Sequence, residues 1–305
     1  MELNTNLPDL QSLKESDLGP YQGLYLGHPY CPDYEGNFLE RPGDLREAVD
    51  CLRQQGKKVY VSTYAAPKSR ELDRVRAILE VAASANVDAV EAHNLGVVRI
   101  IRREFPSLAI HTGIFANVYT DAGAARLREY GVRRVTPNYE LSLEEIDQLA
   151  AASGVEVELL VHGKMPLGIT DSCFLLQYRN ASGLDCPGLC RENFWLRRHE
   201  WVLKPIGQVM LSGTDVCMLE HLPGLAARGY RVFRVETLSE GPEYRSRVGK
   251  IYAEAIFSAA EAGVYRGGPV DRARDWLREL RELSAHGLCN GYYFARSGRD
   301  YVGVM

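Results

Sequence analysis

The sequence predicts an α/β fold, a (β/α)8 barrel of the TIM type that occupies residues 1–305 as a single domain. Short β-branched segments alternate along the chain with amphipathic stretches of helical periodicity. The connections between most of them are short, which favours right-handed βαβ units and a parallel sheet. A barrel of about 250 residues with additions fits this length. A doubly wound open sheet is the alternative, but no glycine-rich dinucleotide motif follows the first predicted strand.

The predicted strands are short and rich in the residue types that favour buried strands. They are Gly23–Leu26, Lys58–Ser62, Val87–Glu91, Leu108–His111, Val132–Thr136, Val155–Val161, Gln208–Leu211 and Arg231–Glu236. One helix begins at Ser142, which stands three residues before Glu145 in the pattern of a capping box. The carboxyl-terminal part predicts two closing helices and a short aromatic tail that forms a hairpin: Pro242–Ala262, Pro269–Ala285 and Cys289–Met305.

The connection between the sixth and seventh predicted strands, from His162 to Gln208, is the longest and carries three cysteines. In an α/β barrel, a long insertion after a strand lies at the carboxyl ends of the strands, where active sites form. We therefore expect a cysteine-bearing insertion after strand six that reaches the catalytic face.

The composition disfavours several classes of protein. A net charge of −4 gives no strongly basic surface, which argues against tight binding to nucleic acid. The first residues are polar and lack the apolar run of a signal peptide, and no stretch approaches the roughly 20 apolar residues of a membrane helix. We expect a cytoplasmic protein without a membrane span, in which thiols stay reduced. Metal binding, catalysis or burial then explains its cysteines better than disulfides do.

Three cysteines form the densest chemical signal, in the spacing Cys173–x12–Cys186–x3–Cys190. Pro187 and Gly188 separate the last two, so a tight turn can aim both thiolates at one metal centre. Structural zinc usually takes two CxxC pairs, and this chain has none. The spacing favours an iron–sulfur cluster on four thiolates, with zinc and structural or catalytic cysteines as alternatives.

The fourth thiolate has two candidates on the same barrel face. Cys31 follows the first predicted strand, and Cys217 follows the seventh. Cys51 lies in the middle of a predicted helix, where a small buried thiol is the simpler interpretation. Cys289, near the carboxyl terminus, is also interpreted as structural.

Polar residues at the ends of the predicted strands form a candidate pocket. Glu91, His93 and His162 are the candidates for moving protons. Four further residues are candidates for orienting a polar substrate: Tyr25, Asn94, Asn117 and Arg234. Neither GxSxG nor HExxH occurs in the sequence, so serine or zinc hydrolase chemistry has no support.

At these residues the chain resembles peptidase U family thirty-two, the collagenase-like peptidases. The resemblance runs from Tyr25 to Phe294 through GKKVYVST, EAHNLGV, HTGIFANVY, ELSLEEI, VELLVHGKMPLGITDSC and EYRSRVGKIY. Several members of this family are cluster-dependent hydroxylases that work without oxygen. The resemblance therefore implies oxygen-independent hydroxylation, with hydroxylation of an RNA base and peptidase activity as alternatives.

Within this family the chain is most similar to the UbiV branch, the iron–sulfur subunit of the UbiU–UbiV system for anaerobic ubiquinone hydroxylation. Pro166 replaces a cysteine of the common family pattern, as in that branch, whereas Cys217 matches a ligand of the wider family. The resemblance implies a homologous partner subunit in a heterodimer, a small aromatic or prenylated substrate, and prephenate as hydroxyl donor, with RNA as a second substrate class. It implies a [4Fe–4S] cluster on Cys31, Cys173, Cys186 and Cys190.

Overall fold

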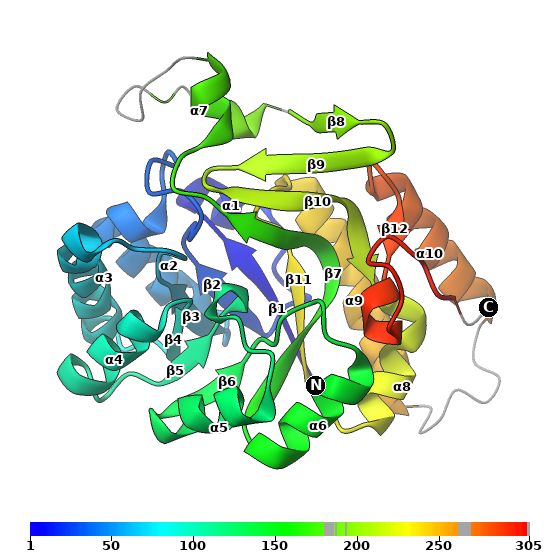
Figure 1. Ribbon diagram of the computed structural model, residues 1–305, viewed down its shortest axis with the longest axis horizontal. Helices are drawn as coiled ribbons and strands as arrows, with labels where there is room; N and C mark the ends of the chain where they lie inside the picture. Colours follow the sequence, from blue (N-terminus) through cyan, green and yellow to red (C-terminus); the bar gives the residue numbers. More distant parts are fainter. Residues whose placement is uncertain (180–185, 187, 193, 262–269, 304–305) are drawn as a thin grey trace.

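Eight parallel strands close into a barrel at the centre of the molecule (Figure 1), as the sequence predicts. The computed structural model describes residues 1–179, 186, 188–192, 194–261 and 270–303. Each strand pairs with the next, and β11 closes the ring by pairing in parallel with both β1 and β7. The barrel strands are β1 Glu2–Leu7, β2 Gly23–Leu26, β3 Lys58–Ser62, β4 Ala89–Ala92, β5 Ile110–Thr112, β6 Val132–Val135, β7 Glu156–Ile169 and β11 Val232–Glu236.

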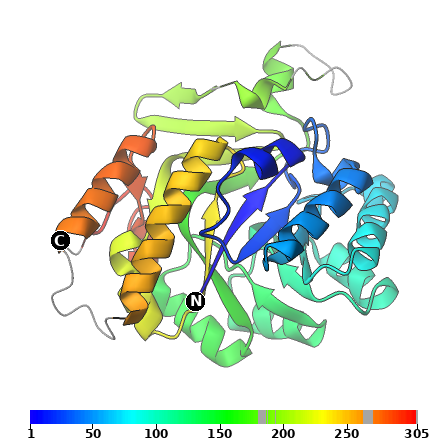
Figure 2. The ribbon, with the colours of Figure 1, turned by 180° about the vertical axis from the view of Figure 1, so that it is seen from behind.

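Helices surround the barrel, as Figures 1 and 2 show from opposite sides. They are α1 Leu10–Glu15, α2 Pro42–Gln54, α3 Leu72–Ser84, α4 Leu95–Glu104, α5 Asp121–Glu129, α6 Leu143–Ser153, α8 Leu222–Ala227 and α9 Pro242–Glu261. Short 3-10 helices lie at Phe38–Glu40, Ser69–Glu71, Ile114–Ala116, Leu189–Arg191, Leu219–His221 and Gly291–Phe294. The capping box predicted for α6 is confirmed, because Ser142 accepts from the Glu145 amide and the Glu145 carboxylate accepts from the Ser142 amide.

The first barrel strand is one that the sequence analysis did not predict. The side chains of Asn4 and Asn6 in β1 point into the barrel, where Asn4 Nδ2 donates to Glu158 at 2.7 Å. Because the interior is polar, β1 lacks the apolar pattern by which the other strands were recognised. The predicted strand Gln208–Leu211 is wrong as a barrel strand, since it belongs to β10, Val209–Cys217, which pairs antiparallel with β7.

A small antiparallel sheet covers the carboxyl-terminal end of the barrel and lies above it in Figure 1. β7 continues past the barrel and pairs with β10, which pairs with β9 Trp201–Ile206, and β9 pairs with β8 Leu196–Arg198. Helix α7, Phe174–Arg179, belongs to the same insertion. The expected insertion is therefore present, but it follows the seventh strand of the barrel because β1 adds one strand before the others.

The carboxyl-terminal segment packs on the outside of the barrel. α9 and α10, Val270–Leu283, correspond to the two predicted closing helices, although Ala262 of the first predicted range and Pro269 of the second lie outside the described residues. The predicted hairpin is wrong for the described part of the tail. Instead, β12 Leu288–Cys289 pairs in parallel with β10, and a 3-10 helix follows. The Tyr293 hydroxyl donates to the Leu160 carbonyl at 2.8 Å and fastens the tail to β7.

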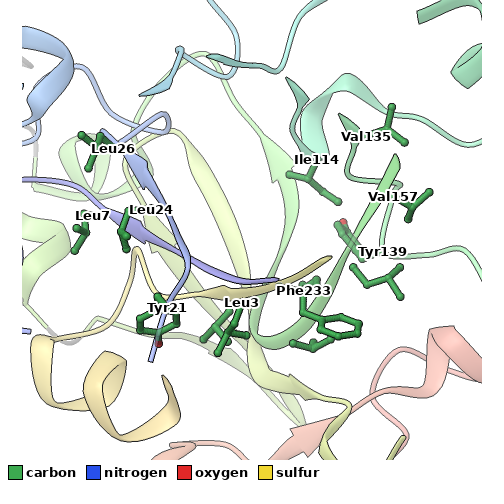
Figure 3. Packing of buried hydrophobic residues seen from close by; sticks show 14 of the residues in the cluster. Leu3, Leu7, Tyr21, Leu24, Leu26, Ile114, Val135, Tyr139, Val157 and Phe233 are labelled. Atoms are coloured by element: carbon green, nitrogen blue, oxygen red, sulfur yellow. The ribbon is translucent and has the colours of Figure 1, made fainter. Parts of the chain in front are cut away.

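The apolar core lies between the strands and the helices, whereas the barrel interior is polar. Figure 3 shows part of this core, and its labelled residues include Leu3, Leu24, Leu26, Val157 and Phe233. Strand side chains alternate, so the residues between these apolar ones face the interior. That interior holds buried charged and polar groups: Glu2, Asn4, Glu91, His111, Arg134, Glu158 and Arg234. Across the described part of the chain, none of the helices combines the length and apolar character needed to cross a membrane.

Candidate functional site

Glu91 lies at the mouth of the barrel near the end of β4 and is almost completely buried. Ser62 Oγ on the neighbouring strand β3 donates to Glu91 Oε2 at 2.6 Å. His93 Nε2 lies 3.3 Å from the same oxygen, and Arg234 Nη2 on β11 lies 2.7 Å from Oε1. The structure therefore brings together three residues that the sequence predicted for this face: Glu91, His93 and Arg234.

The charge of Arg234 holds this group together. Its guanidinium also pairs with Glu158 Oε2 at 2.8 Å and lies 3.7 Å from the centre of the Tyr25 ring. Burial alone would raise the pKa of Glu91, but Arg234 and His93 outweigh burial and hold that pKa well below its usual range. Glu91 is therefore a buried, ionised carboxylate whose charge is fixed by its neighbours.

A small cavity of about 20 Å³ lies among these side chains at the barrel mouth. A space of this size holds about one water molecule. Its lining comes from the strands β1, β4, β7 and β11 and from the segments that follow β2, β4, β5 and β6: Asn6, Pro29, Tyr30, Glu91, His93, Ile114, Thr136, Leu160, Pro166, Arg234 and Glu236. The arrangement provides fixed charges and hydrogen-bonding groups around one polar atom of a ligand.

Other predicted site residues have different surroundings. His162 packs against α9, where its Nδ1 lies 3.3 Å from the Tyr252 hydroxyl, and it does not line the cavity. Burial lowers the pKa of His162 to about 4. Asn94 caps the start of α4 by accepting from the Gly96 amide at 2.7 Å. Asn117 ends a 3-10 helix with a positive φ of 52°.

Tyr25 is buried below the cavity. Its hydroxyl donates to Glu158 Oε2 at 3.1 Å and lies 3.2 Å from His111 Nδ1. Tyr25 and His111 therefore support the ion pair of Arg234 and Glu158 from inside the barrel and do not line the cavity.

The four cysteines Cys31, Cys173, Cys186 and Cys190 line a second cavity of about 330 Å³. All four are partly buried. Cys31 comes from the loop after β2, Cys173 directly precedes α7, and Cys190 lies in the 3-10 helix Leu189–Arg191. Burial, followed by the neighbouring Cys190, raises the pKa of Cys31 to about 12. Among the residues that the structure describes, no three side chains of His, Cys, Asp or Glu converge closely enough to bind one metal ion.

The turn between β9 and β10 brings the insertion onto the loop that carries Cys31. The Gln208 amide donates to the Tyr30 carbonyl at 2.9 Å. Gly207 has a φ of +55°, and a Cβ there would lie 2.4 Å from the Tyr30 oxygen and 2.6 Å from Cys31 Cβ. Only glycine fits this contact. Sequence analysis missed Gly207, whose signal is a glycine between the two strand-like segments VLKPI and QVML.

The remaining cysteines lie away from this cavity. Cys217, the competing candidate for the fourth thiolate, is fully buried and lies 3.6 Å from the Tyr252 hydroxyl. Cys289 lies 3.2 Å from Thr214 Oγ1 in the core, and Cys51 lies in α2. The structure thus places Cys31, and not Cys217, beside the three cysteines of the insertion.

Residues 31–302 match the model of the peptidase family U32. The chain belongs to this family. The U32 match runs from the loop after β2 to the carboxyl-terminal tail and includes all residues that line the cysteine cavity, but not Asn6, Pro29 and Tyr30 of the barrel cavity.

Relatives in the U32 family carry names of different activities. A protein of Methanocaldococcus jannaschii named an uncharacterized protease is 30% identical over 270 residues, which cover 85% of this chain and 64% of that protein. The tRNA hydroxylation protein P of Escherichia coli is 23% identical over 329 residues, covering 91% of this chain and 71% of that protein. A 23S rRNA 5-hydroxycytidine synthase of Escherichia coli is 21% identical over 264 residues, covering 86% of this chain and 40% of that protein. This chain spans less than two thirds of the length of the first and third of these relatives.

Replacing Arg234 by methionine should lower the free energy of unfolding by about 3–5 kcal/mol at neutral pH, because two buried carboxylates lose their partner. Without Arg234, only His93 and Ser62 still oppose the effect of burial, so the pKa of Glu91 rises. A buried carboxyl with a raised pKa opposes folding above that pKa, where it is ionised, and no longer does so when it is protonated at lower pH. The loss in free energy of unfolding relative to wild type should therefore be smaller at pH 5 than at pH 8. Urea unfolding at both pH values measures this.

The control for this experiment is Arg76→Met, since Arg76 pairs with Glu104 on the exposed surface. That variant should show little change at either pH. An Arg234→Met deficit that is equal at pH 5 and pH 8 would contradict the assigned ion pairs.

Proposed function

We propose that the four cysteines of the larger cavity bind a [4Fe–4S] cluster and that the chain takes part in oxygen-independent hydroxylation. The observation that carries the proposal is the meeting of Cys31 with Cys173, Cys186 and Cys190 around one cavity, across a long separation in sequence. The names of the hydroxylating relatives support the reaction class. A reducing cytoplasm would suit such thiolates.

The cavity fits a cluster better than a single zinc ion. Four thiolates bound to one zinc at 2.3 Å stand about 3.8 Å apart, and the described side chains show no such convergence. In a cluster each thiolate binds a different iron, so the sulfurs stand further apart around a larger body. A cavity of about 330 Å³ leaves room for it.

A bound cluster would supply one-electron transfer. The protein's own residues would bind and orient the substrate at the neighbouring barrel mouth. Tyr30 joins the two places, because it lines the barrel cavity and directly precedes Cys31. The insertion would exclude water, since it covers the mouth with Pro166 and with the apolar side chains of Ile206, Val209 and Leu211.

The first substrate candidate is a ubiquinone precursor, with prephenate as hydroxyl donor and a homologous subunit as partner. The similarity to the UbiV branch supports this choice, and the net charge of −4 does not favour a polyanionic substrate. Hydroxylation of an RNA base is the second candidate, supported by relatives named for tRNA and rRNA. Mass spectrometry of quinones and of RNA nucleosides from anaerobic cells with and without the gene separates the two.

Cys31→Ala should lose most of the bound iron, whereas Cys217→Ala should retain it. The physical reason is that Cys31 lines the shared cavity and Cys217 is buried elsewhere. The measurement is iron and sulfide content, with a visible spectrum, of protein purified without oxygen. Wild-type protein should be brown and hold roughly four irons per chain.

Cys51→Ala is the matched control for this series, because Cys51 lies in α2 and should leave the iron content unchanged. Gly207→Ala should lower the iron content without removing any thiol, since its Cβ would displace the Tyr30–Cys31 backbone. A colourless protein with one tightly bound zinc, or iron that survives in Cys31→Ala and is lost in Cys217→Ala, would refute the proposed ligand set.

We expect purified protein to leave casein and gelatin uncleaved. The residues that line the cysteine cavity include no histidine, and those that line the barrel cavity include His93 but no serine or cysteine. An activated nucleophile requires such a pair within hydrogen-bond reach. Gel assays of both substrates measure this, and cleavage that disappears in Cys173→Ala or Glu91→Gln would contradict the expectation.

A further inference from the structure

A second carboxyl group, that of Glu236, lines the barrel cavity together with Glu91. Glu236 ends β11, two residues after Arg234, so both side chains point to the interior face of the strand. Glu236 is buried and lines the same cavity as Glu91. The backbone holds it closely, because a Cβ on Gly163 of β7 would lie 2.2 Å from the Glu236 carbonyl oxygen.

The surroundings of Glu236 differ from those of Glu91. Burial raises the pKa of Glu236 to about 7, and the Leu238 amide, Arg234 and Arg245 only partly oppose that effect. The Leu238 amide donates to Glu236 Oε1 at 2.9 Å. The charged and titratable groups that act on Glu236 are Arg234 of β11, Glu91 of β4, Arg245 of α9 and the Tyr30 hydroxyl of the loop after β2.

The surroundings of the two carboxyl groups therefore shift their pKa values in opposite directions, down for Glu91 and up for Glu236. Arg234 lies 2.7 Å from Glu91 and keeps it ionised, while Glu236 makes no ion pair with a cation among the described residues. Two carboxyl groups whose environments separate their protonation in this way commonly divide acid–base and electrostatic roles at an active site. Glu91 suits the permanent charge, and Glu236 suits proton exchange.

Unpartnered polar atoms indicate that the cavity receives a polar ligand atom. Asn6 Oδ1 and His93 Nδ1 are buried and have no hydrogen-bond partner within the part of the chain that the structure describes. Both residues line the cavity. Buried polar atoms without partners are costly unless a water or ligand satisfies them. The space of about 20 Å³ holds one oxygen-sized group.

We infer that Glu236 is an acid–base residue that exchanges a proton with a hydroxyl oxygen of a ligand seated among Asn6, His93 and Glu91. In one direction the neutral carboxyl gives its proton to the deprotonated, negatively charged form of that oxygen, which forms the ligand O–H bond, and the carboxylate left behind faces Arg234 and Arg245. In the reverse direction the carboxylate accepts the proton of the ligand O–H. No oxidant or reductant takes part in this step. The proton exchange is argued from the cavity itself, and only the overall reaction that it serves rests on the proposed function.

The first test measures the protonation of Glu236 directly in the full-length protein purified without oxygen. Infrared difference spectra of protein labelled with ¹³C at the glutamate side-chain carboxyl are recorded from pH 5 to pH 9. We expect a protonated carboxyl band that disappears with a midpoint near pH 7. The band should be absent in Glu236→Gln. In Glu236→Asp, a protonated carboxyl band should be present at the frequency of aspartate when the aspartate side chains are labelled as well.

The matched control is Glu104→Gln, whose carboxylate pairs with Arg76 on the surface and should leave the band unchanged. Glutamine at position 236 keeps an oxygen that accepts from the Leu238 amide, so the local fold should persist. Thermal unfolding checks this, and Glu236→Asp supplies a second variant. Absence of the band, or its survival in Glu236→Gln, overturns the inference.

The second test uses anaerobic hydroxylation of a ubiquinone precursor. Glu236→Gln should lower kcat by roughly 10²–10⁴-fold, remove the ionisation near pH 7 from the rate profile and leave the iron content unchanged. Glu236→Asp should recover part of the rate. Full turnover by Glu236→Gln at every pH overturns the inference. Wild-type protein that contains no iron after purification without oxygen would instead refute the proposed function. The infrared titration would still decide the role of Glu236.

Discussion

The contact between the turn at Gly207 and the Tyr30–Cys31 backbone is the constraint on which both cavities depend. Gly207 approaches without a Cβ, and the Gln208 amide donates to the Tyr30 carbonyl at 2.9 Å. This contact places the insertion over the barrel mouth and sets Cys31 beside the insertion cysteines. The same backbone segment presents the Tyr30 side chain to the barrel cavity. Two neighbouring sites are thus positioned by one close approach of main chains.

The second constraint is the polar interior of the barrel. Buried charges are tolerated only where they are paired. Arg234 forms ion pairs with both Glu91 and Glu158, and Arg134 pairs with Glu2 at 2.7 Å. Such a chain of ion pairs fixes side-chain positions more narrowly than an apolar core would. The ion pairs therefore form a rigid base for the barrel mouth. They contribute less to the free energy of unfolding than apolar side chains would, and the apolar core between strands and helices supplies that stability.

The sequence predicted those parts of the fold whose pattern follows burial on one side. The amphipathic helices, the capping box at Ser142 and most strands follow that rule, and the insertion was located by its length. Sequence analysis did not predict β1, because Asn4 and Asn6 face a polar interior and interrupt the apolar pattern of a buried strand. His162 was grouped with Glu91 because both stand at the ends of predicted strands, but the local irregularity between β7 and β11 turns His162 toward α9. The family resemblance already favoured Cys31 over Cys217, but the Gly207 contact that brings the insertion onto the Cys31 loop has no periodic signature in the sequence.

The arrangement of the cysteines also has a mechanical meaning. Cys31 belongs to the barrel, whereas Cys173 lies roughly 140 residues later in the chain, in the insertion. A group held by thiolates of the barrel loop and of the insertion would close a very long loop of the chain. It would crosslink the insertion to the barrel and favour the arrangement in which the insertion covers the barrel mouth. Destruction of that group by oxygen would remove the crosslink. The barrel mouth would then be free to open, so loss of the cofactor and loss of the enclosed pocket would be one event.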